Sequence, residues 1–215
     1  MKKLLAILLA VAMVACMFCL ASCDSGKEPA KETDPPQGTD PATDAPTEPA
    51  TDAPEDPDPA YNDDYVNLTG KVDTANVEGT GAKDDGSEDA VMLFDGDTQT
   101  KWCQIVDTED GTTTIQWAMT KATKIDAYTF SSANDSPERY PADWVLYGSN
   151  DGEEWTEVDT VEGAERVTEF FTESGIFECD APAAYTNYKI HFTKNGTTDR
   201  IIYQISELTL LGAKA

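Results

Sequence analysis

The sequence has few cations, a single histidine and few cysteines for its length. Of its 215 residues, 15 are Lys or Arg, 41 are Asp or Glu, and His191 is the only histidine, which gives a formal net charge of −26 at pH 7. This charge repels phosphate backbones and argues against a nucleic-acid-binding protein. It also argues against adsorption to anionic lipid. One histidine and scattered cysteines provide no cluster of zinc ligands.

The residues of a catalytic site are missing as well. His191 has no second histidine and no nucleophilic Ser or Cys partner that would complete a triad, so we interpret it as a strand residue. The many acids offer chance pairs, but none stands in a recognisable glycosidase pattern. We therefore expect a protein that is not an enzyme. Its charge suits a surface module or one that attracts cations.

The longest apolar run lies at the N-terminus. Two lysines precede an apolar run over residues 4–20, as in a secretory signal peptide. The run ends in Leu-Ala-Ser-Cys at residues 20–23, which resembles the lipobox of bacterial lipoproteins. The resemblance implies cleavage after residues 1–22 and acylation of Cys23 with chains such as palmitate, facing outward on the bacterial cell membrane. The alternative is a retained transmembrane helix, because spanning takes roughly 17–25 residues.

Cleavage would leave two of the five cysteines in the folded part. Cys16 and Cys19 would leave with the signal peptide, and Cys23 would carry the lipid. We interpret the remaining Cys103 and Cys179 as small buried thiols. A disulfide between them is the alternative, because an exported protein meets an oxidising or neutral compartment.

Residues 23–65 form an acidic linker rich in Pro, Thr and Asp. Nine of the twelve prolines lie here, in repeats such as Thr-Asp-Ala-Pro, with almost no large apolar side chain. Such a segment cannot bury enough surface to offset its chain entropy, so we predict that it is disordered. Proline and like charges extend it. One interpretation is that the linker lets the folded domain reach through a cell wall or coat. The alternative is a tolerated linker whose length has no particular function.

Residues 66–215 have the pattern of a β protein. Short runs of β-branched and aromatic residues are separated by Gly, Asn, Asp and Pro, and no window shows a clean apolar stripe of helical period. The expected strands are residues 112–118, 124–130, 143–147, 187–192 and 203–211. The region is long enough for a sandwich of two sheets. We expect four tryptophans in its core: Trp102, Trp117, Trp144 and Trp155.

Four blocks of this region occur together and in order. They are LFDGDTQTKW at residues 93–102, SSANDSPERYP at residues 131–141, WVLYGSNDGEEW at residues 144–155 and ISELTLLG at residues 205–212. Together they resemble the F5/8 type C (discoidin) family, which includes the family 32 carbohydrate-binding modules. The resemblance implies an eight-stranded jelly-roll β-sandwich of the galactose-binding type over residues 66–215, acting as a non-catalytic monomer.

The resemblance also implies one structural calcium ion (Ca²⁺) at the turn in the first block. The matching ligands are the side chains of Asp95, Thr100 and Glu207 and the backbone carbonyls of Met92, Asp97 and Ser206. Ca²⁺ takes about six to eight oxygen ligands and accepts flexible loops. Gly96 permits the sharp turn that brings such oxygens together. The alternative is an ordinary turn with solvated carboxylates.

The family further implies a carbohydrate site on loops at one end of the sandwich. The matching candidates are Asn134, Asp135, Arg139, Tyr140, Arg200 and Tyr203, with Gln104 within reach of the same end. An Arg fork reaches two oxygens at once. The alternative for Arg139 is an ion pair with Asp135, and the alternative for both tyrosines is packing at the edge of the core. Leu93 stands where galactose binders can carry an acidic residue.

The sequence therefore predicts a lipid-anchored surface protein whose folded domain recognises a glycan or glycoconjugate. The alternative is a non-catalytic protein-interaction or structural module of the cell envelope.

Overall fold

The computed structural model describes residues 58–79, 81–197 and 200–215, and within them the chain is almost entirely β. The predicted all-β sandwich is confirmed, with eleven strands in the described residues rather than eight. Two strands of only two or three residues and the division of the strand predicted over residues 203–211 account for the difference. In these residues no helix is both long and apolar enough to cross a bilayer. The predictions for the signal peptide, Cys23 and residues 23–57 of the linker lie outside the described residues.

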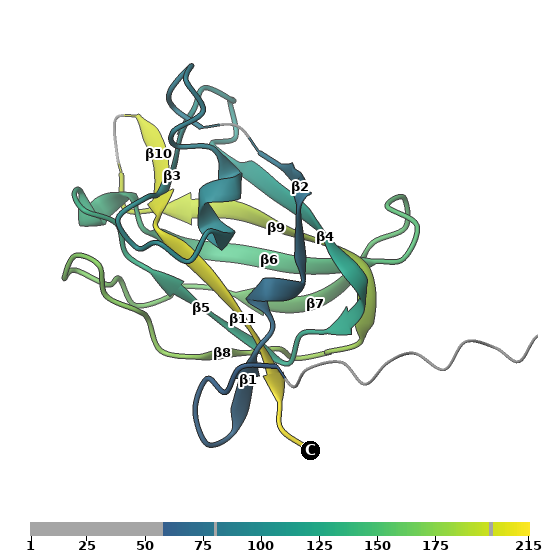
Figure 1. Ribbon diagram of the computed structural model, residues 1–215. Coiled ribbons are helices and arrows are strands. Elements are labelled where there is room, and N and C mark those ends of the chain that lie inside the picture. The colour runs from purple at the N-terminus through teal and green to yellow at the C-terminus, as the bar shows by residue number, and fades with distance from the viewer. Residues whose placement is uncertain (1–57, 80, 198–199) are drawn as a thin grey trace, which may run out of the picture. The chain divides into compact units, whose positions relative to one another are not determined.

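The strands form two larger sheets and a two-stranded ribbon, and the larger sheets lie face to face (Figure 1). The first has the order β1 (Tyr65–Asn67), β11 (Glu207–Ala213), β5 (Ala127–Ser131) and β8 (Phe177–Glu178). The second has the order β2 (Val72–Glu78), β4 (Thr113–Lys124), β9 (Ala184–Asn195), β6 (Pro141–Ser149) and β7 (Thr156–Val161). The ribbon pairs β10 (Ile201–Ile205) with β3 (Trp102–Val106), and the 3-10 helices are η1 (Thr69–Lys71), η2 (Ala90–Phe94) and η3 (Pro137–Arg139). All strand pairs are antiparallel.

An aromatic core fills the space between the two larger sheets. Phe130 of β5 lies with its ring centroid 4.9 Å from that of Trp144 on β6 and 6.0 Å from that of Phe192 on β9. Trp102, Trp117 and Trp144 are fully buried, as predicted. Edge-to-face aromatic pairs of this kind add to the free energy gained by burying apolar area.

A buried hydrogen-bonded triad joins both sheets inside this core. The hydroxyl of Tyr128 on β5 donates to Asp159 Oδ2 on β7 at 2.6 Å, and Trp144 Nε1 on β6 donates to the same hydroxyl at 2.7 Å. Burial raises the pKa of the Asp159 carboxyl, although the hydrogen bond from Tyr128 acts in the opposite direction. The triad therefore satisfies three polar groups that the core would otherwise leave unpaired.

The predicted strand over residues 203–211 is in fact two strands. It breaks at Ser206, so that β10 joins the ribbon and β11 joins the first sheet. Ser206 N–H donates to the carbonyl of Ser131 at 2.8 Å, and its hydroxyl lies 3.0 Å from the carbonyl of Ser132. This fully buried residue holds the chain at the switch between sheets.

Strand β5 has no exposed face. Every residue of β5 is buried. The outer face of β5 is covered because Thr129 donates to Glu173 Oε1 at 2.7 Å, and Tyr61 donates to Glu173 Oε2 at 2.6 Å. A segment predicted to be linker therefore covers this sheet.

The end of the predicted linker belongs to the folded domain, which corrects the boundary at residue 65. Asn67 N–H donates to the carbonyl of Pro59 at 2.7 Å, and Lys71 Nζ lies 2.5 Å from Asp58 Oδ2. Tyr65 already lies in β1. These contacts, together with the bond from Tyr61 to Glu173, fix residues 58–65 on the sheet.

Trp155 is not in the core, contrary to the prediction. It precedes β7 in the hairpin turn, where it is half-buried, and Lys189 Nζ lies 4.2 Å from its ring centroid. A cation over an indole face is favourable at a surface. His191 is a strand residue, as predicted, and its Nδ1 lies 2.8 Å from Thr114 Oγ1. Cys103 and Cys179 are free thiols, as predicted, but only Cys103 is buried, and Cys179 is half-buried.

We expect the substitution Tyr128→Phe to lower the free energy of unfolding by about 1–3 kcal/mol, because it leaves the buried Asp159 and Trp144 without their shared partner. Urea denaturation followed by tryptophan fluorescence measures the change. Tyr65→Phe is the matched control, because that hydroxyl bonds to Glu178 in an exposed position, and it should change stability by less than about 0.5 kcal/mol. Equal effects of the two substitutions would contradict a structural role for the triad.

Candidate functional site

The loop that follows η2 folds around the carboxylate of Asp95. Asp97 N–H donates to Asp95 Oδ1 at 2.8 Å, and the Thr100 hydroxyl donates to Asp95 Oδ2 at 2.8 Å. The same hydroxyl lies 2.9 Å from the carbonyl oxygen of Asp97. Gly96 has a φ of 75°, in the left-handed region that glycine adopts without strain. Three of the predicted calcium ligands are therefore close together in one turn.

Glu207 reaches this loop from the first residue of β11. The residue is only 7% exposed, and its Oε1 atom is buried without a hydrogen-bond partner in the described structure. The pKa of Glu207 is raised to about 8, mainly by burial and then by the neighbouring Asp95 carboxylate, while the backbone N–H groups of Gly96 and Asp97 partly oppose the shift. An ionised Glu207 therefore needs a cation beside it.

The remaining predicted calcium ligands, Met92 and Ser206, flank these two carboxylates in the chain. Met92 lies in η2, directly before the loop, and Ser206 directly precedes Glu207. Within the described residues, no group of three or more His, Cys, Asp or Glu side chains gathers in a way that could hold a metal ion. A cation here would depend on two carboxylates with hydroxyl and carbonyl oxygens. An all-oxygen set of this kind fits a hard cation such as Ca²⁺.

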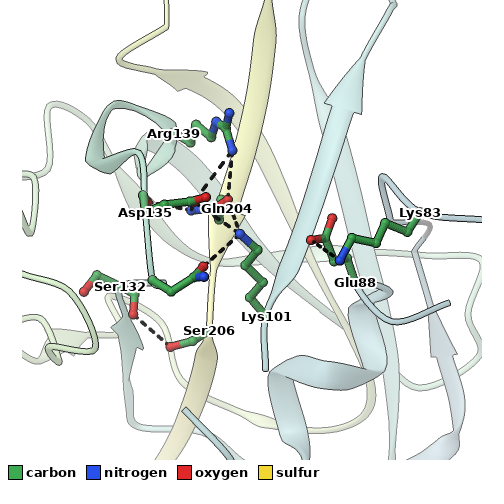
Figure 2. Close-up of polar contacts among 9 residues, drawn as sticks. Lys83, Glu88, Lys101, Ser132, Asp135, Arg139, Gln204 and Ser206 are labelled. Carbon is green, nitrogen blue, oxygen red and sulfur yellow. Dashed lines mark hydrogen bonds and ion pairs between the residues drawn. The ribbon is translucent and has the colours of Figure 1, made fainter. Parts of the chain in front are cut away.

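A second polar cluster lies one residue beyond the loop (Figure 2). Lys101 Nζ donates to Asn134 Oδ1 at 2.9 Å and to Gln204 Oε1 at 3.0 Å, and it lies 3.2 Å from Asp135 Oδ1. Gln204 Nε2 donates to Asp135 Oδ1 at 2.7 Å. Arg139 Nη1 donates to Gln204 Oε1 at 3.2 Å and lies 3.7 Å from Asp135 Oδ1. We call these five residues the loop cluster.

Figure 2 shows Asp135 and Gln204 between the two cations of the loop cluster, with Lys101 on one side and Arg139 on the other. Burial disfavours ionisation of Asp135, but the hydrogen bond from Gln204 and the charges of Lys101 and Arg139 outweigh this effect and lower its pKa. Asp135 is therefore a stable carboxylate with half of its side chain exposed. The ion pair predicted as the alternative role of Arg139 is present.

The two tyrosines predicted to stack on a sugar are buried in the core, which corrects that assignment. Tyr203 is fully buried, and its hydroxyl donates to the carbonyl of Gly111 at 3.1 Å. Tyr140 is 2% exposed and packs edge-on against Phe130, with 6.2 Å between the ring centroids. Neither ring is exposed enough to stack on a ligand, although Tyr140 lines the same small hollow as Asp135 and Gln204. Packing at the edge of the core was the alternative stated for both residues.

Arg200 and Gln104 do not join the loop cluster. The exposed Arg200 guanidinium lies 4.0 Å from Asp107 Oδ1, and Gln104 Oε1 on β3 accepts a hydrogen bond from Thr113 Oγ1 at 2.8 Å. Of the six predicted ligand-binding residues, the structure therefore brings together Asn134, Asp135 and Arg139.

The aromatic side chain that does lie beside the cluster is Phe170. It is 51% exposed and lines a small hollow together with Asp135 and Gln204. Its loop is held against the 131–135 segment because the Ser132 hydroxyl donates to the carbonyl of Glu169 at 2.6 Å. A Phe-Phe pair within an acidic, irregular segment was the one signal in the sequence that pointed to it. Lys101 lies inside a matched block and Gln204 lies directly before one, but the sequence did not indicate their roles.

The model of the F5/8 type C domain family matches residues 74–202. A curated relative, peptide-N(4)-(N-acetyl-beta-glucosaminyl)asparagine amidase of Arabidopsis thaliana, is 38% identical over 63 residues. That match covers 29% of this chain and 9% of the relative, so the chain spans only a small part of that protein.

Solved structures share the fold at low sequence identity. The Clostridium perfringens module CpGH89CBM32-5, solved with GalNAc-β-1,3-galactose, is 14% identical with a TM-score of 0.54, over 67% of this chain and 98% of that module. The family 32 carbohydrate-binding module of Clostridium perfringens NanJ, solved with galactose, is 15% identical with a TM-score of 0.51, over 69% and 99%. These likenesses confirm the jelly-roll sandwich.

The pKa of Glu207 leads to a prediction about stability and pH. Because its folded pKa is raised from 4.5 to about 8, the folded state holds this proton more tightly than the unfolded chain. Without a bound cation, the stability from this group is complete at low pH and is lost as the pH rises through about 8. We expect the free energy of unfolding, measured by urea denaturation in chelator, to fall between about pH 5 and about pH 9.

Glu207→Gln is the matched variant for this measurement, because it keeps the shape of the side chain but does not titrate in this range. Its stability should depend less on pH than that of the wild type. The same pH dependence in both proteins would show that Glu207 is not the group responsible.

Proposed function

Because the chain belongs to the F5/8 type C domain family, we propose that its folded domain binds carbohydrate at the loop cluster. The observation that carries this proposal is the exposed ring of Phe170, which lines one hollow with Asp135 and Gln204. Arg139 contacts both of these polar residues and so extends the set of polar groups there. Sugar recognition needs both kinds of group, because polar side chains bond the hydroxyls while an aromatic face covers the C–H groups. The neighbours solved with galactose-containing ligands support this class of ligand.

The loop cluster is already ordered before any ligand binds. Its internal hydrogen bonds hold Arg139 and Asp135 in place, so binding would not have to freeze long side chains. Among the described residues, Nη1 is the only guanidinium nitrogen of Arg139 with a partner, which leaves the rest of the fork for a ligand. The hollow at this cluster has a volume of about 10 Å³, which is enough for about one water. A sugar would therefore lie across its rim, and we expect modest affinity.

A protein-interaction role in the envelope is the second candidate. Three large apolar side chains, Phe170, Phe171 and Ile176, are more than a third exposed and lie in one connection between β7 and β8. Exposed apolar groups that are close together often mark a contact with another protein. This role would not require Arg139. Neither role involves catalysis.

We also propose that Ca²⁺ binds between Asp95 and Glu207 with a structural role. The support is the unpartnered, buried Oε1 of Glu207 beside a second carboxylate. The ion would supply positive charge there, and Thr100 with the carbonyls of Met92, Asp97 and Ser206 would complete its oxygen ligands. It would thereby connect the loop after η2 to the last strand.

Finally, we propose that the protein is held on the outer side of a bacterial membrane by lipid on Cys23. The support is the sequence of residues 1–23 alone. Two or more acyl chains give stable anchoring, because each buried CH₂ contributes about 0.8 kcal/mol.

We expect Arg139→Ala to weaken binding of galactose and of GalNAc-β-1,3-galactose by about 10-fold or more, because hydrogen bonds to a charged group contribute about 1.5–3 kcal/mol. Phe170→Ala should have a similar effect through the lost ring face. Isothermal titration calorimetry measures both. Arg200→Ala is the matched control, since it removes an exposed arginine outside the cluster. Binding that survives Arg139→Ala and Phe170→Ala, in variants with unchanged melting curves, would contradict the sugar site.

We expect Ca²⁺ to raise the melting temperature of the chelator-treated domain by several degrees, because a ligand that binds only the folded state stabilises it. Asp95→Asn should remove most of this shift. Asp110→Asn is the control, because Asp110 accepts a backbone hydrogen bond in a similar turn away from Glu207. A wild-type midpoint that does not respond to Ca²⁺ would rule out the ion.

We expect the full-length protein, expressed in a bacterium, to partition into the detergent phase in Triton X-114, and Cys23→Ala to leave it in the aqueous phase or as uncleaved precursor. Mass spectrometry of the N-terminal peptide should show the acyl chains on the wild type. An unmodified Cys23 in the mature wild-type protein would contradict lipid anchoring.

A further inference from the structure

A larger hollow lies over the outer face of the first sheet. Its volume is about 860 Å³, within the range of roughly 300–1,000 Å³ that is usual for small-molecule sites. We call it the sheet-face hollow, and its lining shares no residue with the loop cluster. The residues that line it are Asp58, Pro59, Asn67, Thr69, Gly70, Lys71, Phe94, Asp95, Gly96, Thr98, Ser131, Phe171, Glu173, Glu207 and Thr209.

The floor of this hollow is a polar patch on two paired strands. Along β11, Glu207 and Thr209 alternate with the core residues Leu208 and Leu210, so they face outward. Glu207 is opposite Ser131 of β5 in the strand register. The outer face of these two strands therefore presents hydroxyls and a carboxylate to the hollow.

Several of these groups have no partner in the described part of the chain. No hydrogen bond involves the side-chain hydroxyls of Thr98, Ser131 or Thr209, and Oε1 of Glu207 is buried and unpartnered. Calcium would explain the free oxygen of Glu207. It would not explain the free hydroxyls or a hollow far larger than one ion.

An aromatic ring forms one wall of the hollow. Phe171 is 42% exposed and has a φ of 53°, which is a rare conformation for a bulky residue. This backbone turn separates two successive rings, so that Phe170 lines the hollow at the loop cluster and Phe171 lines the sheet-face hollow. Lys71, paired with Asp58, is also part of the wall.

We propose that the sheet-face hollow is a second carbohydrate site, with Phe171 as the stacking surface and the hydroxyls of Ser131 and Thr209 as hydrogen-bonding groups. Its ligand would be a neutral or amino sugar. Four carboxylates line the hollow, on Asp58, Asp95, Glu173 and Glu207, and the single lysine Lys71 is paired with Asp58. With Ca²⁺ between Asp95 and Glu207, the carboxylate of Glu173 still leaves the hollow with a net negative charge. This charge disfavours uronic acids and sulfated sugars, and it favours an amine or uncharged hydroxyls.

This site extends the proposed function but does not require the loop cluster to bind sugar. A ligand at both hollows would let one domain hold a branched or repeating glycan at two points, which increases avidity without a new contact at either site. The carbohydrate class rests here on the ring, the free hydroxyls and the charge of the hollow itself.

The test is a titration of the isotope-labelled domain, with Ca²⁺ present, followed by amide NMR shifts. The probes are oligomers of glucosamine, galactose and oligomers of galacturonic acid. We expect glucosamine oligomers or galactose to shift the amides of Ser131, Phe171 and Thr209, and galacturonic acid oligomers to leave them unchanged. No shift at these three amides with either glucosamine oligomers or galactose would overturn the proposal, and so would a preference for the acidic oligomers.

Two variants separate this site from the loop cluster. Phe171→Ala should weaken the affinity obtained from the Thr209 shifts at least 10-fold and leave any shifts at Asn134 and Arg139 unchanged. Phe170→Ala should do the reverse. If Phe171→Ala alters the fold, Thr209→Val removes one hydroxyl at constant shape and should weaken binding at the hollow. Shifts confined to Asn134 and Arg139 would overturn the second site and leave the proposed function intact. Shifts confined to Ser131, Phe171 and Thr209 would support the second site and contradict sugar binding at the loop cluster.

Discussion

Two carboxylates meet where the loop after η2 reaches the last strand, and much of the functional end of the domain depends on how their charge is balanced. Glu207 is buried and has an unpartnered oxygen, while Asp95 beside it organises the loop through Asp97 and Thr100. A buried charge without a partner costs several kcal/mol. The folded protein must therefore keep a proton on Glu207 or hold a cation there. The all-oxygen surroundings favour a cation such as Ca²⁺.

This pair is connected to both proposed sugar sites through short stretches of chain. The loop that begins at Asp95 leads directly into Lys101, which bonds to Asn134, Asp135 and Gln204. Two residues beyond Gln204 the chain is held by the buried Ser206, and the next residue is Glu207. On the other side, Asp95 and Glu207 belong to the lining of the sheet-face hollow. A cation at this point would therefore set the position of groups in both hollows.

The sequence was most informative where matched blocks carry polar residues at fixed spacing. The family resemblance is confirmed by the family model, and Asp95, Thr100 and Glu207 lie together in the structure as it implied. Prediction from the sequence failed where the direction of a side chain depends on tertiary packing. Tyr140 lies at the end of a matched block and Tyr203 lies two residues before another, but both rings are buried in the core.

Irregular segments were the second source of error. Phe170 and Phe171 lie in a connection without strand periodicity, and a positive φ decides which way each ring points. Residues 58–65 have the composition of the linker, yet Tyr61 and Tyr65 dock on Glu173 and Glu178, which lie more than a hundred residues later in the chain. Contacts this distant in sequence cannot be recognised from local composition. Trp155 was misplaced because a matched block does not show where its strand begins.

We propose that a cation at Asp95 and Glu207 further restrains the loop cluster through Lys101. Amide hydrogen exchange measured by mass spectrometry, in Ca²⁺ and in chelator, tests it most directly. Ca²⁺ should slow exchange in residues 95–101 and also in residues 131–135, while exchange in the distant β6–β7 hairpin should be unchanged. Equal exchange of both segments with and without Ca²⁺, in a protein that remains folded, would contradict it.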